Sequence, residues 1–169
     1  MALVKFVIGG EGRADREWKW GDIMGVGQLA LMTAALFAGA AIYVSVAEQP
    51  ARSALDDRGM LTQWKPSYKH GAAMQAPLAL VGCLLGLVAW WHTKDWRWLA
   101  GAIVLVANWP YTLLIIRPVN NELLAIEPSN AGPQSRALIE KWGRLHAGRT
   151  ALGGLATVLF LWASIVAPN

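Results

Sequence analysis

The chain has 169 residues, of which 55% are hydrophobic and 15% are charged, whereas an average soluble domain is about 25% charged. This composition argues against an ordinary soluble globule and against a disordered chain, which has few apolar residues and a high charge. Cys83 is the only cysteine, which excludes an intramolecular disulfide and a metal site built from cysteines alone. The net charge is +4, but the Lys and Arg residues are scattered, so we expect no nucleic-acid partner.

Four apolar stretches follow one another along the chain. They cover residues 23–47, 71–91, 98–116 and 150–167, and none of them contains a charged residue. A helix needs about 20 apolar residues to cross a hydrocarbon core of about 30 Å, and its backbone groups must be hydrogen-bonded internally. We therefore predict an all-α fold, an integral membrane four-helix bundle with up-down-up-down topology.

The sequence divides into two regions. Residues 1–22 are expected to form an N-terminal interfacial or flexible segment, and residues 23–169 to form the four-transmembrane-helix domain. Nine Lys and Arg residues lie in or beside the connections after spans one and three, against six on the other side, which favours long loops in the cytoplasm. We expect an integral membrane protein of the bacterial inner membrane, with membrane lipids as its immediate partners.

Polar and aromatic residues gather at one end of the predicted bundle. The helix ends that meet there carry Tyr43, Glu48, Arg52, Trp64, Tyr68, His70, Asn120, Trp142, His146 and Arg149. Trp142, His146 and Arg149 are spaced at i, i+4 and i+7, which places them on one helix face. Ionisable groups near a bilayer are costly unless they are paired or hydrated, so we expect Glu48 to pair with His146 or with Arg149.

The spacing alone leaves three interpretations of this polar end open. The residues could form an active site, or they could be helix caps and interfacial ion pairs that reach the lipid headgroups. A third interpretation is a metal site in which Glu48, His70 and His146 supply a carboxylate and two imidazoles, the ligand types of non-haem iron. No His-x-x-His or Glu-x-x-His spacing is present, so the metal and the cofactor stay unassigned.

Several motifs at this end share their order and spacing with a known family. They are Glu48-x-Pro50-x-Arg52, Trp64-Lys65-Pro66-Ser67-Tyr68, Trp109-Pro110-Tyr111, Pro118-x-Asn120 and Trp142-x3-His146-x2-Arg149. With these motifs, residues 25–163 resemble the anthrone-oxygenase-like family of small four-helix integral membrane proteins, most of whose members are uncharacterised. The resemblance implies a four-helix membrane fold and, for the members with an assigned activity, oxidation of an anthrone to an anthraquinone by O₂.

The resemblance implies an oxygenase-like oxidoreductase that acts on an anthrone-like or other hydrophobic aromatic molecule. Such an oxygenase can work without a cofactor. An anthrone gives an electron-rich carbanion that reacts with O₂, so the protein must supply a base, oxyanion stabilisation and an apolar pocket. We expect His146 to be the base, Glu48 to orient it, and Asn120 and Arg149 to stabilise the oxyanion. The other expected substrate-binding residues are Tyr43, Arg52, Trp64, Tyr68 and Trp142, whose aromatic members would line a flat pocket.

Two functions without catalysis also fit the sequence. The chain could be an accessory subunit or assembly factor of a larger membrane complex, or a protein that binds a quinone or lipid. Gly82 and Gly86 form a GxxxG pattern, which permits close helix packing within the bundle or between the copies of a homo-oligomer. An aromatic molecule or metal bound to the purified protein would favour the site, and stable co-purification with a complex would favour the subunit.

Overall fold

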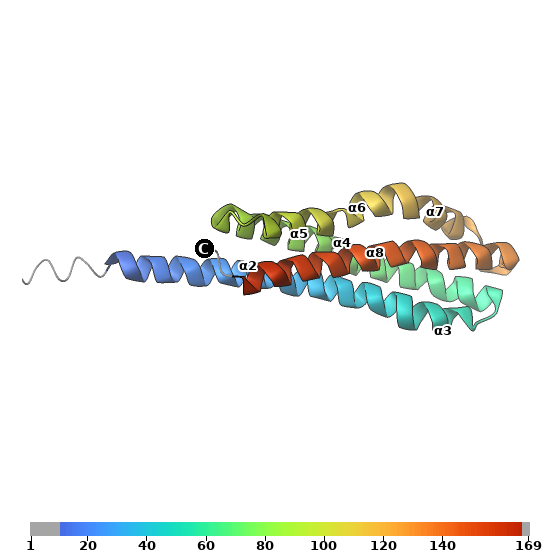
Figure 1. Ribbon diagram of the computed structural model, residues 1–169. Helices are drawn as coiled ribbons and strands as arrows, with labels where there is room; N and C mark the ends of the chain where they lie inside the picture. The colour runs from blue at the N-terminus through green and yellow to red at the C-terminus, as the bar shows by residue number, and fades with distance from the viewer. Residues whose placement is uncertain (1–10, 167–169) are drawn as a thin grey trace, which may run out of the picture.

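The computed structural model describes the backbone of residues 11–166 and the side chains of residues 25–166. Four helical rods run antiparallel in up-down-up-down order (Figure 1). The first rod consists of α2 (Glu11–Tyr43), the π-helical turn η1 (Val44–Glu48) and α3 (Gln49–Ser53), and the second rod is α4 (Asp57–Thr93). The third rod consists of α5 (Trp96–Val106), α6 (Asn108–Tyr111), the π-helical turn η2 (Thr112–Ile116) and α7 (Arg117–Ala125). The 3-10 turn η3 (Pro128–Asn130) leads to the fourth rod, α8 (Pro133–Ile165). The predicted all-α four-helix bundle is confirmed.

Each rod is longer than the apolar stretch from which it was predicted. The segments long and apolar enough to cross a membrane are Gly25–Ser53, Asp57–Thr93, Trp96–Ala125 and Pro133–Ile165, with 29, 37, 30 and 33 residues. At 1.5 Å per residue these helices are about 44–56 Å long, whereas the hydrocarbon core is about 30 Å thick. Residues that we expected in loops therefore continue the helices at the polar end, because their polar side chains find partners inside the bundle.

The N-terminal segment expected at residues 1–22 is described only in part. Residues 11–22 are helical and continue directly into the rest of α2. Residues 1–10 lie outside the described residues, as do residues 167–169 and the side chains of residues 11–24. The interfacial position of this segment and the orientation in the membrane stay predictions.

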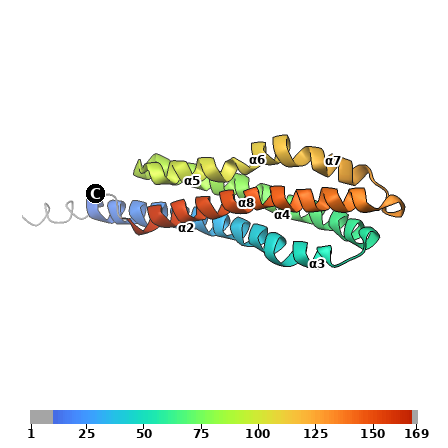
Figure 2. The same ribbon diagram turned by 45° about the vertical axis from the view of Figure 1, so that its right-hand side comes forward.

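The third rod changes course where α6 meets η2. In both views the rod is displaced outward from the bundle at α6 (Figure 1 and Figure 2). Pro110 lies within α6 and lacks a backbone N–H, and the wider π-helical turn η2 follows it directly. The first rod also contains a π-helical turn, η1. Such segments often border functional sites. Both turns contribute side chains to the cavity described below.

Two apolar clusters fill the interior of the bundle. The cluster toward the α4–α5 turn combines many alanines with the rings of Phe37, Trp98 and Phe160. Gly101 lies directly against Phe160, since a Cβ added to this glycine would be 2.5 Å from the ring. The other cluster contains Trp64 and Trp142 and lies at the polar end. Small residues that admit large rings let helix backbones approach closely, which is the usual packing of helices in lipid.

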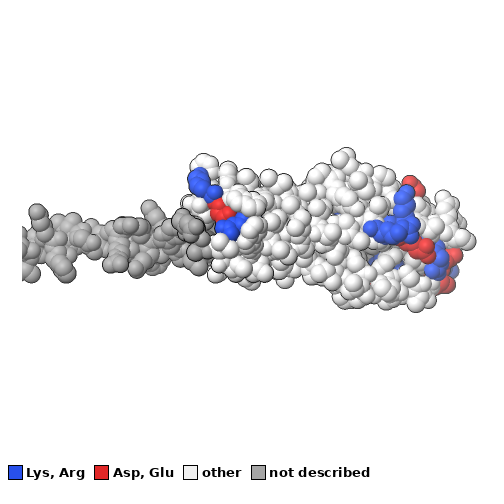
Figure 3. Space-filling view, in the orientation of Figure 1, with Lys and Arg blue, Asp and Glu red and all other residues white. Residues whose placement is uncertain are grey.

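Charged side chains lie at the two ends of the bundle, and the visible face between them is uncharged (Figure 3). Large apolar side chains are exposed along this middle region, including Leu114 at 76% and Val158 at 61%. At the α4–α5 turn, Asp95 caps α5 and forms an ion pair of 2.7 Å with Arg97. Burial raises the pKa of the Asp95 carboxyl, but hydrogen bonds from Arg97 and its charge outweigh burial, so the pKa lies below its ordinary value.

Candidate functional site

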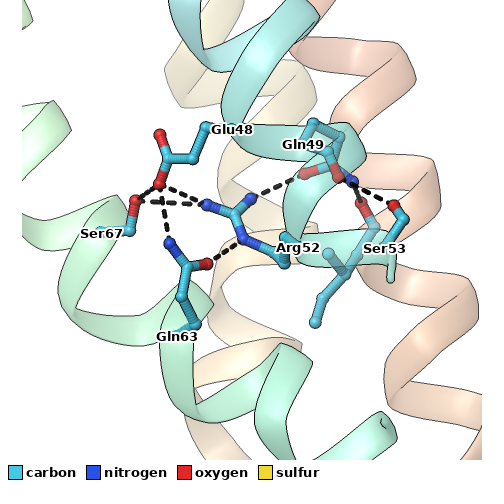
Figure 4. A network of polar contacts seen from close by, with 7 residues as sticks. Glu48, Gln49, Arg52, Ser53, Gln63 and Ser67 are labelled. Atoms are coloured by element: carbon cyan, nitrogen blue, oxygen red, sulfur yellow. Dashed lines mark hydrogen bonds and ion pairs between the residues drawn. The ribbon is translucent and has the colours of Figure 1, made fainter. Parts of the chain in front are cut away.

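A buried ion pair forms the base of the polar end (Figure 4). The Arg52 side chain is 1% exposed, and its Nη2 donates to Glu48 Oε1 over 2.7 Å, one helical turn earlier. The same Glu48 oxygen accepts hydrogen bonds from Gln63 Nε2 at 3.0 Å and from the Ser67 hydroxyl. The remaining Arg52 nitrogens donate to the Gln63 side chain and, over 2.7 Å, to Gln49 Oε1. A buried ion pair is favourable only when further hydrogen bonds satisfy its charges; here they satisfy the buried Arg52 guanidinium and Oε1 of the partly buried Glu48.

Aromatic rings lie against this ion pair. Trp64 stacks on Tyr68 with 5.0 Å between ring centroids, and its ring edge meets Trp142 at 5.8 Å. Trp142 in turn stacks on His146 at 5.0 Å, and the Arg52 guanidinium lies 5.6 Å from the Trp142 ring centroid. The rings therefore connect the ion pair to the imidazole and fix the plane in which His146 lies.

The side chains of Ser45 and Thr150 fix the proton position on His146. The Thr150 hydroxyl donates to the Ala41 carbonyl at 3.2 Å, and its oxygen lies 3.0 Å from the Ser45 oxygen. When Thr150 gives its one proton to the carbonyl, the Ser45 hydroxyl donates to Thr150. The Ser45 oxygen, 3.3 Å from His146 Nδ1, then accepts from an Nδ1–H. In this arrangement the neutral imidazole carries its free lone pair on Nε2, the atom that can act as a base.

Two glycines of α8 set the position of this helix against its neighbours. Gly148 leaves room for the Tyr111 ring, whose hydroxyl donates to the Leu145 carbonyl at 2.8 Å. Gly143 leaves room for the Gln49 side chain, whose amide donates to another carbonyl of α8. Residue His146 lies between these two contacts, so its place along the bundle is fixed from both sides.

A cavity opens beside His146, where all four rods meet. Its volume is about 30 Å³, which is room for a water molecule, so a larger ligand requires the lining side chains to move apart. The lining residues are Val44, Glu48, Ser67, Tyr68, Gly71, Ala72, Gln75, Ile116, Asn120, Trp142, His146 and Arg149. The two π-helical turns supply Glu48 and Ile116, so they lie at the border of the cavity.

Three polar side chains in this cavity hold buried atoms without partners. Asn120 is 1% exposed, and neither its amide nitrogen nor its oxygen has a hydrogen-bond partner among the described residues. The same holds for the side-chain oxygen of Gln75, which is 2% exposed, and for Nε of Arg149. Buried polar groups are nearly always hydrogen-bonded, so these atoms are suited to bind the polar atoms of a ligand or water.

The structure brings together six of the nine residues that the sequence predicted for the site. Glu48, Tyr68, Asn120, Trp142, His146 and Arg149 line the cavity. Arg52 and Trp64 lie behind its wall, where they hold Glu48 and Trp142 in place. Tyr43 is 62% exposed and does not line the cavity.

The predicted pairing of Glu48 is wrong. Glu48 pairs with Arg52, which lies one turn away on the same rod, and contacts neither His146 nor Arg149 by a hydrogen bond within the described residues. Arg149 instead lies over the Phe37 ring at 5.4 Å. His146 is oriented by Ser45, a role that we had given to Glu48. Asn120 lies within α7 and does not end the helix, so it is not a cap.

Nothing in the described residues supports the metal interpretation. No group of three His, Cys, Asp or Glu side chains lies close enough to hold an ion in residues 25–166. His70 is exposed on α4 and does not line the cavity that holds Glu48 and His146. The ligand set proposed from the sequence is therefore not assembled.

Sequence reasoning missed Ser45, Gln63, Ser67, Gln75 and Thr150. Gln63 and Ser67 are four residues apart on α4, the same spacing as Glu48 and Arg52 on the first rod. Two polar i, i+4 pairs on neighbouring helices indicate facing polar surfaces, so this signal was available. No comparable spacing marks Ser45, Gln75 or Thr150, which resemble ordinary polar residues within apolar helices.

The chain was compared with protein families, curated proteins and solved structures. The model of the family described as anthrone oxygenase matches residues 64–159, a segment that contains Trp64, Asn120, Trp142, His146 and Arg149. The chain belongs to the anthrone oxygenase family. This confirms the resemblance inferred from the motifs and supports an oxygenase-like function at the level of the family. No solved structure matches the chain.

Two curated relatives agree with the family match. An anthrone oxygenase of Claviceps purpurea (strain 20.1) is 28% identical over 144 residues, which cover 76% of this chain and 82% of the relative. Anthrone oxygenase dmxR16 of Cryptosporiopsis sp. (strain 8999) is 29% identical over 149 residues, which cover 80% of this chain and 86% of the relative. Both relatives are fungal proteins, and the bacterial inner membrane expected from the sequence stays a prediction.

Proposed function

We propose that the protein is a membrane-embedded oxygenase that oxidises an anthrone-like, flat hydrophobic aromatic molecule in the cavity beside His146. The observation that carries the proposal is a buried imidazole, 3% exposed, whose Nδ1 lies 3.3 Å from the Ser45 oxygen and whose Nε2 is the base when Ser45 accepts from Nδ1–H. The same cavity contains the unpartnered amide of Asn120. A base and an unpartnered polar group in one small cavity are the parts that carbanion formation requires.

Each step of the reaction uses a group that lines the cavity. Nε2 of His146 removes a proton from the methylene carbon of the anthrone, and the charge moves to the carbonyl oxygen. Asn120 or Arg149 stabilises that oxygen, since both offer unpartnered N–H groups. The rings enter when the lining side chains move apart, and Tyr68 and Trp142 then supply flat apolar walls. The role of the Glu48–Arg52 pair is to hold these walls in place.

The overall reaction balances with O₂ as the oxidant. The carbanion transfers electrons to O₂, a C–O bond forms, and the proton on His146 returns to the distal oxygen to give a hydroperoxide. Loss of water from this species breaks the O–O bond and one C–H bond and leaves a second ketone. The methylene carbon is thus oxidised by four electrons, one oxygen atom enters the anthraquinone, and the other leaves as water.

The membrane position is supported by the surface of the bundle. Four helices are long and apolar enough to cross a bilayer, and large apolar side chains are exposed between two charged ends (Figure 3). A soluble monomer rarely exposes an apolar surface of this extent. A hydrophobic aromatic substrate would concentrate in the same bilayer, which suits a protein embedded there.

The proposal is tested with the purified protein in lipid nanodiscs and an anthrone. O₂ uptake and anthraquinone formation should occur with the unmodified protein and fall to the uncatalysed rate in His146→Gln. The matched control is His92→Gln, since His92 is exposed at the opposite end of α4 and should leave the rate unchanged. Binding of the anthrone without O₂ uptake by the unmodified protein would favour the non-catalytic binding function. Equal rates for both variants would remove His146 from the reaction.

A further inference from the structure

A second cavity lies between α4 and the α6–η2 segment. Its volume is about 130 Å³, and it is lined on one side by Ala72, Ala76 and Ala79 of α4. Trp109 and Leu113 face these alanines from the third rod. The alanines are spaced at i, i+4 and i+7, so one face of α4 lacks the bulk that would fill this space.

This second cavity adjoins the cavity of His146. Ala72 and Arg149 line both of them, so the two spaces share a wall made of one methyl group and one guanidinium. Arg149 has no ion-pair partner in the described part of the chain, and its Nε is unpartnered. A side chain without such a partner can move aside at a lower cost than one held in an ion pair.

The second cavity also contains a polar group that lacks a partner. Asn108 is 2% exposed, and its Nδ2 donates to the Leu105 carbonyl at 3.0 Å, which assigns the other amide atom as oxygen. That Oδ1 has no hydrogen-bond partner among the described residues. A carbonyl oxygen can only accept, so the group that completes this site must be a donor such as the hydroxyl of a phenol.

The second cavity lies within the depth of a hydrocarbon core, near the boundary on the polar side, when the core begins at the Thr93 end of α4. Ala76 lies 17 residues from the Thr93 end of α4, or about 26 Å along the helix, within a hydrocarbon core of about 30 Å. Ser67, at the Glu48–Arg52 pair, lies about 39 Å from the same end and therefore beyond the core. Leu113 and Trp109 are 47% and 41% exposed on the outer side, and the Trp109 indole donates to the Ala76 carbonyl at 3.2 Å.

We propose that the cavity at Ala76 is a lateral entrance through which a flat, hydroxylated polycyclic aromatic molecule passes from the bilayer interior to the His146 cavity. This inference rests on the proposed function and adds a route and a ligand class to it. The ligand moves between α4 and α6, past the Trp109 indole, while its hydroxyl group donates to Asn108 Oδ1. At that point only Arg149 and Ala72 lie between the ligand and the His146 cavity, and movement of the Arg149 side chain lets the ligand pass.

The entrance is tested by the rate at which a ligand arrives, which does not depend on turnover. The probe is a hydroxyanthraquinone supplied in lipid vesicles, and its arrival in protein-containing nanodiscs is followed by stopped-flow quenching of tryptophan fluorescence. Ala76→Phe should slow association about tenfold or more, since mutations within one interface change association rates by one to three decades. Trp109→Ala removes the outer wall and should speed association.

The matched control carries the same new side chain on the same helix. Ala73→Phe lies three residues earlier on the exposed face of α4, outside this cavity, and should associate at the unmodified rate. Correct folding of each variant is checked by its elution profile and its melting temperature. Equal association rates for Ala76→Phe and Ala73→Phe, or slower association in Trp109→Ala, would overturn the entrance. Association that depends on residue 76 without any O₂ uptake would support the entrance and refute the proposed oxygenase.

Discussion

Replacing Thr150 by Val tests whether the hydrogen-bond chain to His146 selects the reactive tautomer. Thr150 does not line the cavity, and Val has nearly the same shape, so the change removes one hydroxyl and little else. In the unmodified protein the Thr150 oxygen accepts from Ser45 at 3.0 Å, which leaves the Ser45 oxygen to accept from Nδ1–H. Without the Thr150 oxygen, the Ser45 hydroxyl is free to donate to Nδ1, which moves the imidazole proton to Nε2.

The size of the effect follows from the hydrogen bonds that are exchanged. The Nδ1–H tautomer loses the support of one bond and the Nε2–H tautomer gains one, each contributing about 0.5–1.5 kcal/mol. The tautomer ratio therefore changes by about 1–3 kcal/mol, or about 5- to 150-fold, and we expect kcat to fall about tenfold with KM nearly unchanged. Thr150→Ser restores the hydroxyl and should recover most of the rate.

The tautomer can also be observed without enzyme activity. In protein labelled with ¹⁵N-histidine, the chemical shifts of the two ring nitrogens at mildly alkaline pH show which one carries the proton. His146 should carry its proton on Nδ1 in the unmodified protein and in Thr150→Ser, and largely on Nε2 in Thr150→Val. The reasoning is refuted if Thr150→Val keeps the Nδ1–H signal, or if Thr150→Ser loses as much activity as Thr150→Val.

Three further predictions concern stability. Arg52→Met leaves the Glu48 carboxylate without its buried partner and should lower the free energy of unfolding by about 3 kcal/mol. Adding Glu48→Gln should restore part of this loss. An unchanged melting temperature in Arg52→Met would show that the pair contributes little. Gly101→Ala should cost about 1–3 kcal/mol because its Cβ meets a buried ring, whereas Gly154→Ala, with nothing within 4 Å, should leave the melting temperature equal or higher. Since the pKa of Asp95 is lower in the folded state, its stabilisation is present above the ordinary value of 3.8 and is lost as pH falls through the folded value. Asp95→Asn should therefore flatten the loss of melting temperature below that pH, and parallel curves would contradict the assignment.

The fold was predictable because hydrocarbon leaves few alternatives for a backbone. Four uncharged stretches of sufficient length must be helices, and short connections must make neighbours antiparallel. The helix ends were predicted less well, because residues 58–70 are polar enough to look like a loop. The helix continues there because Gln63 and Ser67 find a partner on another rod, and such a partner is not visible in a local pattern.

The sequence indicated which residues lie at the candidate site better than it indicated which of them contact one another. Helix-face spacing selected Trp142, His146 and Arg149, and all three line the cavity. The partner of Glu48 was not found, although Arg52 lies one turn away, because an interhelical partner looked equally good from sequence. Tyr43 was placed at the site by proximity in sequence, which does not fix the helix face, and its side chain is exposed.

The sequence by itself therefore determined the helical rods, their antiparallel order and the end at which polar groups collect, because apolar length and chain connectivity fix these features. Only the tertiary structure decided which polar atoms meet. Rotation of each helix about its axis, changed locally by two π-helical turns, sets whether Ser45 or Glu48 faces His146. That rotation depends on how glycines, alanines and rings of four helices fit together, which no single segment of the chain specifies.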